Sequence, residues 1–131
     1  MQKLSGKTAL VTGASAGIGQ ATASALITAG ARVICSARRL ARLNALVSNL
    51  GANAIALELD VCDAASVNSL HSRLPNQWRE IDILINNAGL GLQEPFVAMP
   101  WGHLQGMMDV DMTALTHLTH HFATRMQAQG E

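Results

Sequence analysis

Acidic residues are absent from the first 57 positions of this 131-residue chain, and Glu58 is the first carboxylate. The same stretch carries six basic residues, whereas the remaining 74 carry three arginines and nine acids, so the net charge is zero. A basic half suggests an anionic ligand, and a chance segregation of solvated charges is the alternative. Six charges spread over a stretch with few aromatic residues do not make a nucleic-acid-binding stripe, so we expect no nucleic-acid partner.

Tyrosine is missing altogether, and aromatic residues make up only 3 % of a chain that is 49 % apolar. The core must therefore be built from Ala, Val, Ile and Leu, which suits a sheet covered by close-packed helices. Two cysteines, Cys35 and Cys62, supply neither a disulfide framework nor a metal-ligand spacing. Both end apolar runs, so we expect two buried, reduced thiols.

No stretch of the sequence has the character of a targeting or membrane segment. The first seven residues lack the continuous apolar core of a signal peptide. Residues 8–31 carry no charge and contain a Gly-x-x-x-Gly pair that fits membrane-helix packing, but their hydroxyl and amide side chains make them too polar to span a bilayer. We therefore expect a cytoplasmic protein that does not bind membranes.

Apolar runs alternate with segments of helical period, which is typical of β–α–β units. We expect strands at residues 8–12, 32–36, 54–59 and 81–85. We expect helices at residues 18–29, 40–50, 64–74 and about 101–129, with Asp63 capping the third. Right-handed crossovers then give an α/β fold, a Rossmann-type doubly wound parallel sheet of strand order 3-2-1-4 with a ligand crevice between strands 1 and 4.

The sequence contains no internal repeat or linker, so we expect a single domain over residues 1–131. In that sheet the fourth strand, residues 81–85, would lie at an edge although four of its five residues are large and apolar. Uncovered edges of this kind pair with other chains, and continuous apolar character suits a strand flanked on both sides. We therefore expect the front part of a longer fold, truncated before a fifth strand.

A glycine-rich turn separates the first strand from the first helix, with Gly13, Gly17 and Gly19 in the spacing G-x-x-x-G-x-G. Glycine has no Cβ, so it permits backbone conformations and close approaches that other residues do not. The free N–H groups at the start of the following helix favour a phosphate, as does the helix dipole. Such a glycine pattern is a weak signal when it stands alone.

Three motifs together resemble the short-chain dehydrogenase/reductase family: residues 12–19 (TGASAGIG), Asp60-Val61 and residues 86–89 (NNAG). Their order and spacing match the family along essentially all 131 residues. The stretch from Leu74 to Leu90 is similar to the branch that oxidises 3-hydroxy acids such as serine. The resemblance implies an NAD(P)-dependent oxidoreductase that transfers a hydride between a nicotinamide dinucleotide and a small hydroxyl or carbonyl substrate.

The resemblance also implies which residues hold the cofactor. They are Gly13, Ser15, Ala16, Gly17, Ile18, Gly19, Asp60, Val61, Asn87, Ala88 and Gly89. The backbone of residues 15–19 would bind the diphosphate, and Asp60 would accept from the adenine amino group, although Asp60 could instead cap a helix. Residues 86–89 would lie beside the adenosine ribose, with Asn87 also tying neighbouring strands together, and an ordinary turn after a strand is the alternative.

The choice of cofactor depends on Arg38, which follows the second strand. An NAD site has an acid there for the ribose 2′-hydroxyl, whereas an arginine accommodates a 2′-phosphate. No acid precedes Glu58, and a guanidinium matches phosphate geometry. NADP(H) is therefore favoured over NAD(H), and we expect Arg39 and Arg42 to be solvated helix charges.

The family's catalytic Ser and Tyr-x-x-x-Lys have no counterparts here, because the chain has no tyrosine and its lysines are Lys3 and Lys7. We therefore expect these residues to bind cofactor without turnover. The alternative is a non-catalytic nucleotide-binding or regulatory module that ends at residue 131.

The family's catalytic Asn position is occupied by Asp111, our candidate catalytic residue. It falls on a predicted apolar stripe formed by Leu104, Met108, Asp111, Leu115, Leu118 and Phe122. A carboxylate in such a stripe needs a partner or loses its charge. It could take part in a proton-relay water chain or be satisfied by backbone N–H groups.

Three histidines, His117, His120 and His121, stand at helical spacing that can hold a metal ion. Nothing else supplies the remaining ligands, so we expect no metal and interpret these residues as part of a surface helix or a subunit contact. Members of the family often associate through the long helix that is expected here at about 101–129. The resemblance therefore implies a homo-oligomer.

Overall fold

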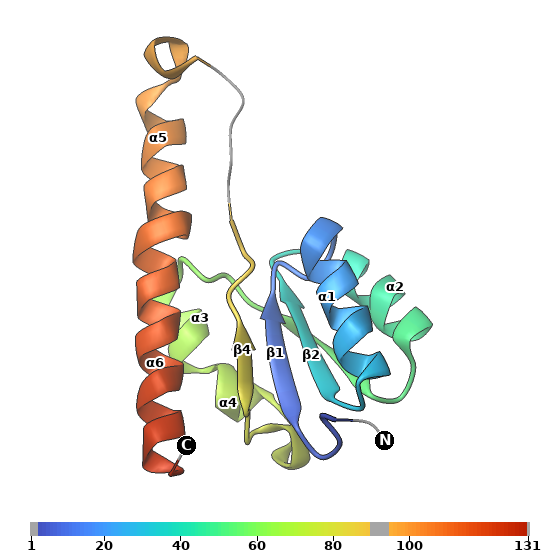
Figure 1. The fold of residues 1–131 in the computed structure, drawn as a ribbon. Helices are drawn as coiled ribbons and strands as arrows, with labels where there is room; N and C mark the ends of the chain where they lie inside the picture. The colour runs from blue at the N-terminus through green and yellow to red at the C-terminus, as the bar shows by residue number, and fades with distance from the viewer. Residues whose placement is uncertain (1–2, 90–94, 131) are drawn as a thin grey trace.

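The computed structural model describes residues 3–89 and 95–130, which contain a four-stranded parallel sheet (Figure 1). Its strands are β1 (Thr8–Thr12), β2 (Arg32–Ala37), β3 (Ala54–Glu58) and β4 (Ile83–Ile85). They lie in the order β3-β2-β1-β4, and each neighbouring pair is parallel. The predicted Rossmann-type α/β sheet and its strand order are confirmed.

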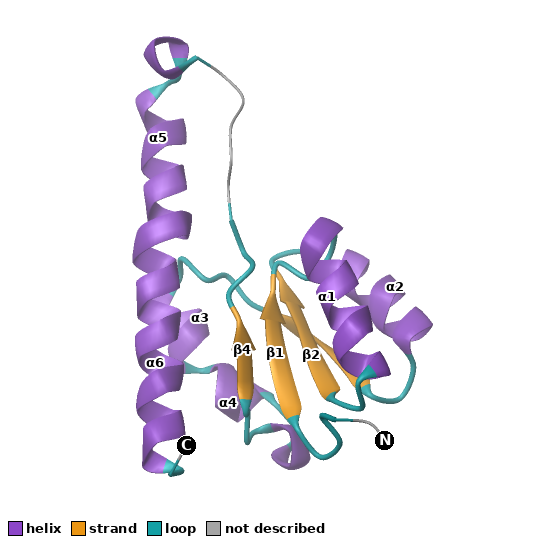
Figure 2. Ribbon diagram, in the orientation of Figure 1, coloured by secondary structure: helices purple, strands orange, loops and turns teal. Residues whose placement is uncertain are grey.

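Helices cover both faces of the sheet (Figure 2). The helical elements are α1 (Gly17–Thr28), α2 (Leu40–Leu50), α3 (Ala64–Asn68), α4 (Leu70–Arg73), α5 (Trp101–Met108), the π-helical segment η3 (Asp109–Ala114) and α6 (Leu115–Ala128), with short 3-10 turns at Asn76–Trp78 and Phe96–Ala98. Helices α1 and α2 pack on one face, and α3, α4 and α6 pack on the other.

Alternating strand residues supply the two halves of the core, since successive side chains of a strand point to opposite faces. Leu10 and Ile34 pack with residues of α3, α4 and α6. Val11, Val33 and Cys35 pack with residues of α1 and α2. The central strands are thus buried on both faces, which agrees with their continuous apolar character.

Two predicted boundaries need correction. The predicted helix over residues 64–74 is interrupted at Ser69, which separates α3 from α4. The predicted cap is correct, because the Asp63 carboxylate accepts from the Ala65 N–H at 3.0 Å. The fourth strand begins two residues later than predicted, and Asp82 instead joins the start of β1 through two hydrogen bonds to Thr8, of 2.8 and 3.0 Å.

The long C-terminal helix is not uniform, and this changes its buried face. The segment η3 forms i→i+5 hydrogen-bonded turns, which accommodate an extra residue and rotate the following helix relative to the first. The buried residues are Ala114, Leu118 and Phe122, whereas Asp111 and Leu115 are exposed. The predicted apolar stripe through Asp111 is therefore wrong, because it assumed an unbroken α-helical period.

The two cysteines differ in environment. Cys35 is fully buried in β2, and burial raises the pKa of its thiol to about 11. Cys62 is exposed, which contradicts the expectation of burial. Its backbone N–H donates to the Asp60 carboxylate at 3.0 Å, so the chain turns outward just after β3. Within the described residues, no helix has the length and apolar character needed to cross a membrane.

Candidate functional site

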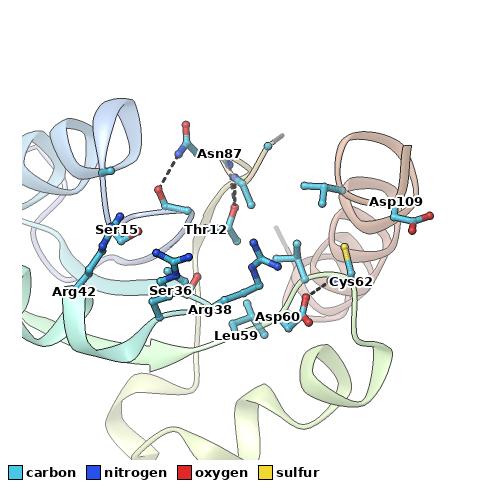
Figure 3. A pocket seen from close by; sticks show the side chains of 18 of the residues that line it. Thr12, Ser15, Ser36, Arg38, Arg42, Leu59, Asp60, Cys62, Asn87 and Asp109 are labelled. Atoms are coloured by element: carbon cyan, nitrogen blue, oxygen red, sulfur yellow. Dashed lines mark hydrogen bonds between the residues drawn. The ribbon is translucent and has the colours of Figure 1, made fainter. Parts of the chain in front are cut away.

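A cleft of about 570 Å³ opens where the parallel strands end (Figure 3). Its walls come from the turn after β1, the β2–α2 junction, the loop after β3, the segment after β4 and the junction of α5 with η3. Parallel α/β sheets place their ligand crevice at this edge, where the strand order reverses. Nine of the predicted cofactor residues line it: Gly13, Ser15, Ala16, Arg38, Asp60, Val61, Asn87, Ala88 and Gly89.

The glycines of the turn after β1 serve different purposes. Gly13 and Gly17 have φ angles of 62° and 59°, in the left-handed region that favours glycine. A Cβ on Gly19 would lie 2.5 Å from Asn87 Nδ2 and would also meet the Gly13 carbonyl oxygen, so α1 can approach the turn only with glycine there. Gly17, Ile18 and Gly19 form the first turn of α1 and are not among the residues that line the cleft.

The start of α1 is arranged to leave its backbone donors available. Ala16 is the N-cap residue, and its side chain provides no capping hydrogen bond. No acidic residue lies in the first turn of α1. The first N–H groups of a helix have no partner within the helix, and the helix dipole adds partial positive charge there. This end of α1 can therefore hold an anionic group.

Thr12 joins the turn after β1 to the segment after β4. Its hydroxyl oxygen accepts from the N–H groups of Asn87 and Ala88, both at 2.9 Å, and its hydroxyl donates to the Ile85 carbonyl at 3.3 Å. Asn87 Nδ2 in turn donates to the Gly13 carbonyl at 3.1 Å. The expected tie between neighbouring strands through Asn87 is confirmed, and Thr12, which we did not single out from the sequence, completes it.

Asp60 and Val61 form the wall of the cleft after β3. One carboxylate oxygen of Asp60 accepts from the Cys62 N–H, and the Asp60 N–H donates to Ser66 Oγ at 3.2 Å. Because Asp63 caps α3, the alternative of Asp60 as the helix cap is wrong. Val61 packs partly against the core while it also lines the cleft.

Three arginines also line the cleft: Arg38 and Arg39 at the β2–α2 junction, and Arg42 in the first turn of α2. Arg39 and Arg42 are exposed, as predicted for solvated charges, and both also border the cleft.

The loop after β3 has charged neighbours that act on the Cys62 thiol. Although Cys62 is exposed, partial desolvation by its neighbours is the first cause that raises the pKa of its thiol, followed by the carboxylates of Asp60 and Asp109. The Arg38 charge opposes this shift, so Arg38 acts at the same loop. Asp109 also lines the cleft and accepts from Gln105 Nε2 at 2.9 Å.

Asp111 lies beside the cleft without lining it. Its Oδ1 atom is 3.5 Å from the position that a Cβ on Gly89 would occupy. The π-helical turns of η3 place Asp111 away from the buried face of the helix. The predicted requirement for a buried partner of its carboxylate therefore does not apply.

The three histidines on α6 do not share one site. His121 pairs with His71 of α4, with their Nε2 atoms 3.2 Å apart, while His120 is exposed. His71 Nδ1 also lies 3.2 Å from the Arg79 carbonyl oxygen, and burial, followed by the Arg125 charge, lowers the pKa of His71 to about 4. Residues 3–89 and 95–130 contain no group of three metal-binding side chains.

The 3-2-1-4 parallel sheet, the glycine turn and the cleft at the strand ends define a Rossmann-type α/β domain. A family model described as short chain dehydrogenase matches residues 7–131, and the chain belongs to that family. The family resemblance noted in the sequence is thereby confirmed. Leu90, the end of the stretch that resembles the 3-hydroxy acid branch, lies outside the described residues.

Two relatives carry names that match the 3-hydroxy acid branch, which the sequence resembles. Serine 3-dehydrogenase of Rhizobium radiobacter is 41 % identical over 115 residues, which cover 87 % of this chain and 46 % of the relative. The NADP-dependent 3-hydroxy acid dehydrogenase YdfG of Salmonella typhi is 40 % identical over 111 residues. The match covers 84 % of this chain and 45 % of that relative. The chain therefore spans about half the length of the curated relatives it matches.

A solved structure is similar over the same half. The closed form of a serine dehydrogenase complexed with NADP+ has a TM-score of 0.81 and 38 % sequence identity. The match covers 86 % of this chain and 46 % of that one.

Proposed function

We propose that this chain forms the cofactor-binding part of an NADP(H)-dependent oxidoreductase that acts on a small hydroxyl or carbonyl compound. The observation that supports this most is the cleft itself, with a glycine turn at one end and Arg38 at the other. The relatives are named for NADP dependence and for serine or 3-hydroxy acids, so we propose a 3-hydroxy acid as the substrate class of the complete protein.

The residues present fit a dinucleotide. The uncapped first turn of α1 would hold the diphosphate through its backbone N–H groups. Asp60 would accept from the adenine amino group, and Val61 would pack against the ring. Residues 87–89 would lie beside the adenosine ribose, in a position maintained by the hydrogen bonds of Thr12.

Arg38 would select the phosphorylated cofactor. It lies at the end of β2, where an acid would favour NAD(H) and an arginine accommodates a 2′-phosphate. No acidic residue precedes Glu58, so neither β2 nor the residues that follow it directly supply the carboxylate that an NAD site uses. Chemistry at the substrate would come from the nicotinamide, which carries the transferred hydride when the cofactor is bound.

The chain itself supplies binding rather than catalysis. It contains no tyrosine, so the family's acid/base group has no counterpart among these 131 residues. Asp111, at the family's Asn position, is our candidate for a contribution to proton transfer in the complete protein. A homo-oligomer through the long C-terminal helix remains our expectation for the assembled enzyme.

Calorimetric titrations with NADPH and NADH test the cofactor assignment. We expect NADPH to bind more tightly than NADH. Arg38→Ala should weaken NADPH binding by about tenfold or more, since a hydrogen bond to a charged group contributes about 1.5–3 kcal/mol. NADH binding should change little. Arg125→Gln removes a positive charge from the last turn of α6 and is the matched control. Equal losses for the two cofactors would remove Arg38 from the phosphate site.

A further inference from the structure

Two histidines from distant parts of the chain meet where α4 lies against α6. His71 of α4 and His121 of α6 are 50 residues apart in the sequence, and their Nε2 atoms lie 3.2 Å apart. Figure 2 shows the two helices on the same face of the sheet. Neither histidine is among the residues that line the cleft, so the pair has no part in the proposed cofactor site.

The two rings share an apolar neighbour that holds them in place. The Phe122 ring, which is 2 % exposed, lies 5.5 Å from the His71 ring and 5.2 Å from the His121 ring, measured between centroids. Leu70, the residue before His71, is fully buried in the same core. Both histidines are themselves half-buried. The core thus keeps the two rings close together while water can still reach them.

A backbone carbonyl sets the tautomer of His71. His71 Nδ1 lies 3.2 Å from the Arg79 carbonyl oxygen, which can only accept a hydrogen bond. Nδ1 therefore carries the proton of the neutral ring, and Nε2 presents an unprotonated lone pair to His121. Histidines that bind metal ions usually donate their other ring N–H to a carbonyl or carboxylate in this way, which fixes the tautomer and the ring orientation.

Both rings are also kept neutral, as histidine ligands of a metal ion must be. Burial, followed by the Arg125 charge, lowers the pKa of His71 to about 4. Burial and then the Arg125 charge also lower the pKa of His121. Without a metal ion, His121 donates its Nε2 proton to the lone pair of His71. A cation would take the place of that proton, which can move to Nδ1 of His121.

The separation of the two nitrogens matches the spacing of ligands around a metal ion. Zinc binds imidazole nitrogen at about 2.0–2.1 Å, so two such nitrogens at a tetrahedral angle lie about 3.3 Å apart. The observed distance of 3.2 Å is close to this value. In the part of the chain that the structure describes, no third histidine, cysteine or carboxylate completes a cluster. Water would therefore occupy the remaining coordination positions.

We propose that His71 and His121 form a two-histidine site for a divalent transition metal ion, represented by Zn²⁺, that ties α4 to α6. Imidazole suits Zn²⁺, Cu²⁺ and Ni²⁺, whereas Mg²⁺ and Ca²⁺ prefer oxygen ligands. The sequence offered no such partner for the histidines of α6, because His71 comes from a helix 50 residues earlier in the chain. The site is independent of the cofactor, so it stands or falls separately from the proposed function.

Two nearby positive charges oppose the binding of a cation. Arg125 lies one turn after His121 and acts on both rings, although its side chain is exposed and therefore screened by water. Arg79 also acts on His71, but its guanidinium donates to two backbone carbonyls. Removal of the Arg125 charge should therefore strengthen metal binding at this site.

Isothermal titration calorimetry with zinc sulfate alone tests the site, on the untagged 131-residue chain in a Cys62→Ser background that removes the exposed thiol. The ligand variants are His71→Gln and His121→Gln. His120→Gln is the matched control, because this histidine is exposed on the same helix. His117→Gln tests the rival pair of His117 and His121, which stand four residues apart on α6. Magnesium chloride is the control for the type of ion.

We expect His71→Gln and His121→Gln each to weaken zinc binding by about tenfold or more, since even the partners of metal ligands contribute that much. His120→Gln should bind zinc as the parent chain does, and Arg125→Gln should bind it about twofold to fivefold more tightly. Mg²⁺ should not bind. Histidine ring ¹⁵N spectra of the parent chain should show zinc-dependent shifts at Nε2 of His71 and His121.

Other results would overturn the proposal. Zinc binding that survives His71→Gln but is lost in His117→Gln would assign the ion to the pair on α6 alone. A folded parent chain that binds no zinc, or ring shifts confined to other histidines, would refute the site as well. The ring spectra are recorded on the parent chain, so the test remains decisive if His71→Gln does not fold.

Discussion

Replacing Gly19 with alanine tests how closely α1 packs on the glycine turn. Gly19 is buried in the first turn of α1, and an added Cβ would lie 2.5 Å from Asn87 Nδ2 and would collide with the Gly13 carbonyl. Neither partner can retreat easily, because Asn87 Nδ2 donates to that carbonyl and the Asn87 N–H donates to Thr12. Helix α1 must therefore move.

The size of the effect follows from the cost of overpacking, about 1–3 kcal/mol in a well-packed site. Alanine in a helix otherwise gains up to about 1 kcal/mol over glycine. Gly102 is the matched control, since it lies in α5 with nothing within 4 Å of an added Cβ. A change of about 1 kcal/mol in the free energy of unfolding shifts the melting temperature of a domain of this size by about 3–5 °C.

Thermal unfolding followed by far-UV circular dichroism measures the difference. Gly19→Ala should melt about 5 °C or more below Gly102→Ala. It should also bind NADPH more weakly, because the N–H groups at the start of α1 move with the helix. If the two variants melt together, the contact between α1 and the Gly13–Asn87 pair is not as close as the structure places it.

Three further predictions concern other parts of the fold. Thr12→Val removes the hydroxyl that accepts from the Asn87 and Ala88 N–H groups, at a site that is 2 % exposed. Urea unfolding should therefore show a loss of about 1–3 kcal/mol in the free energy of unfolding. An unchanged midpoint would contradict this role of Thr12. The pKa of His71 is lowered from 6.5 to about 4, so the unfolded chain binds more protons in that range and stability should fall as pH decreases from about 6.5 toward 4. His71→Gln should flatten this pH dependence and His120→Gln should not; equal slopes in all three proteins would refute it. Finally, the chain mixed with NADPH and a keto acid should show no change in nicotinamide absorbance beyond the blank, and turnover would show that a tyrosine is not needed.

The fold was largely predictable because its strong signals are local. Continuous apolar runs marked the strands, the glycine turn marked the start of α1, and Asp63 marked the start of α3. The order of the strands then followed from the handedness of the crossovers.

The errors arose where tertiary contacts decide the structure. The π-helical turns of η3 cannot be read from residue spacing, and they turned Asp111 outward. That Arg39 and Arg42 also border the cleft depends on how α2 lies beside it, which composition does not reveal. Cys62 followed an apolar run yet lies in a turn closed by its own neighbour Asp60.

The central claim is that the first turn of α1 binds the cofactor diphosphate, and backbone amide NMR during an NADPH titration tests it most directly. The account predicts the largest shifts at the amides of residues 15–19, with smaller ones at Arg38 and at residues 87–89. Saturable binding that leaves the amides of residues 15–19 unchanged would contradict it.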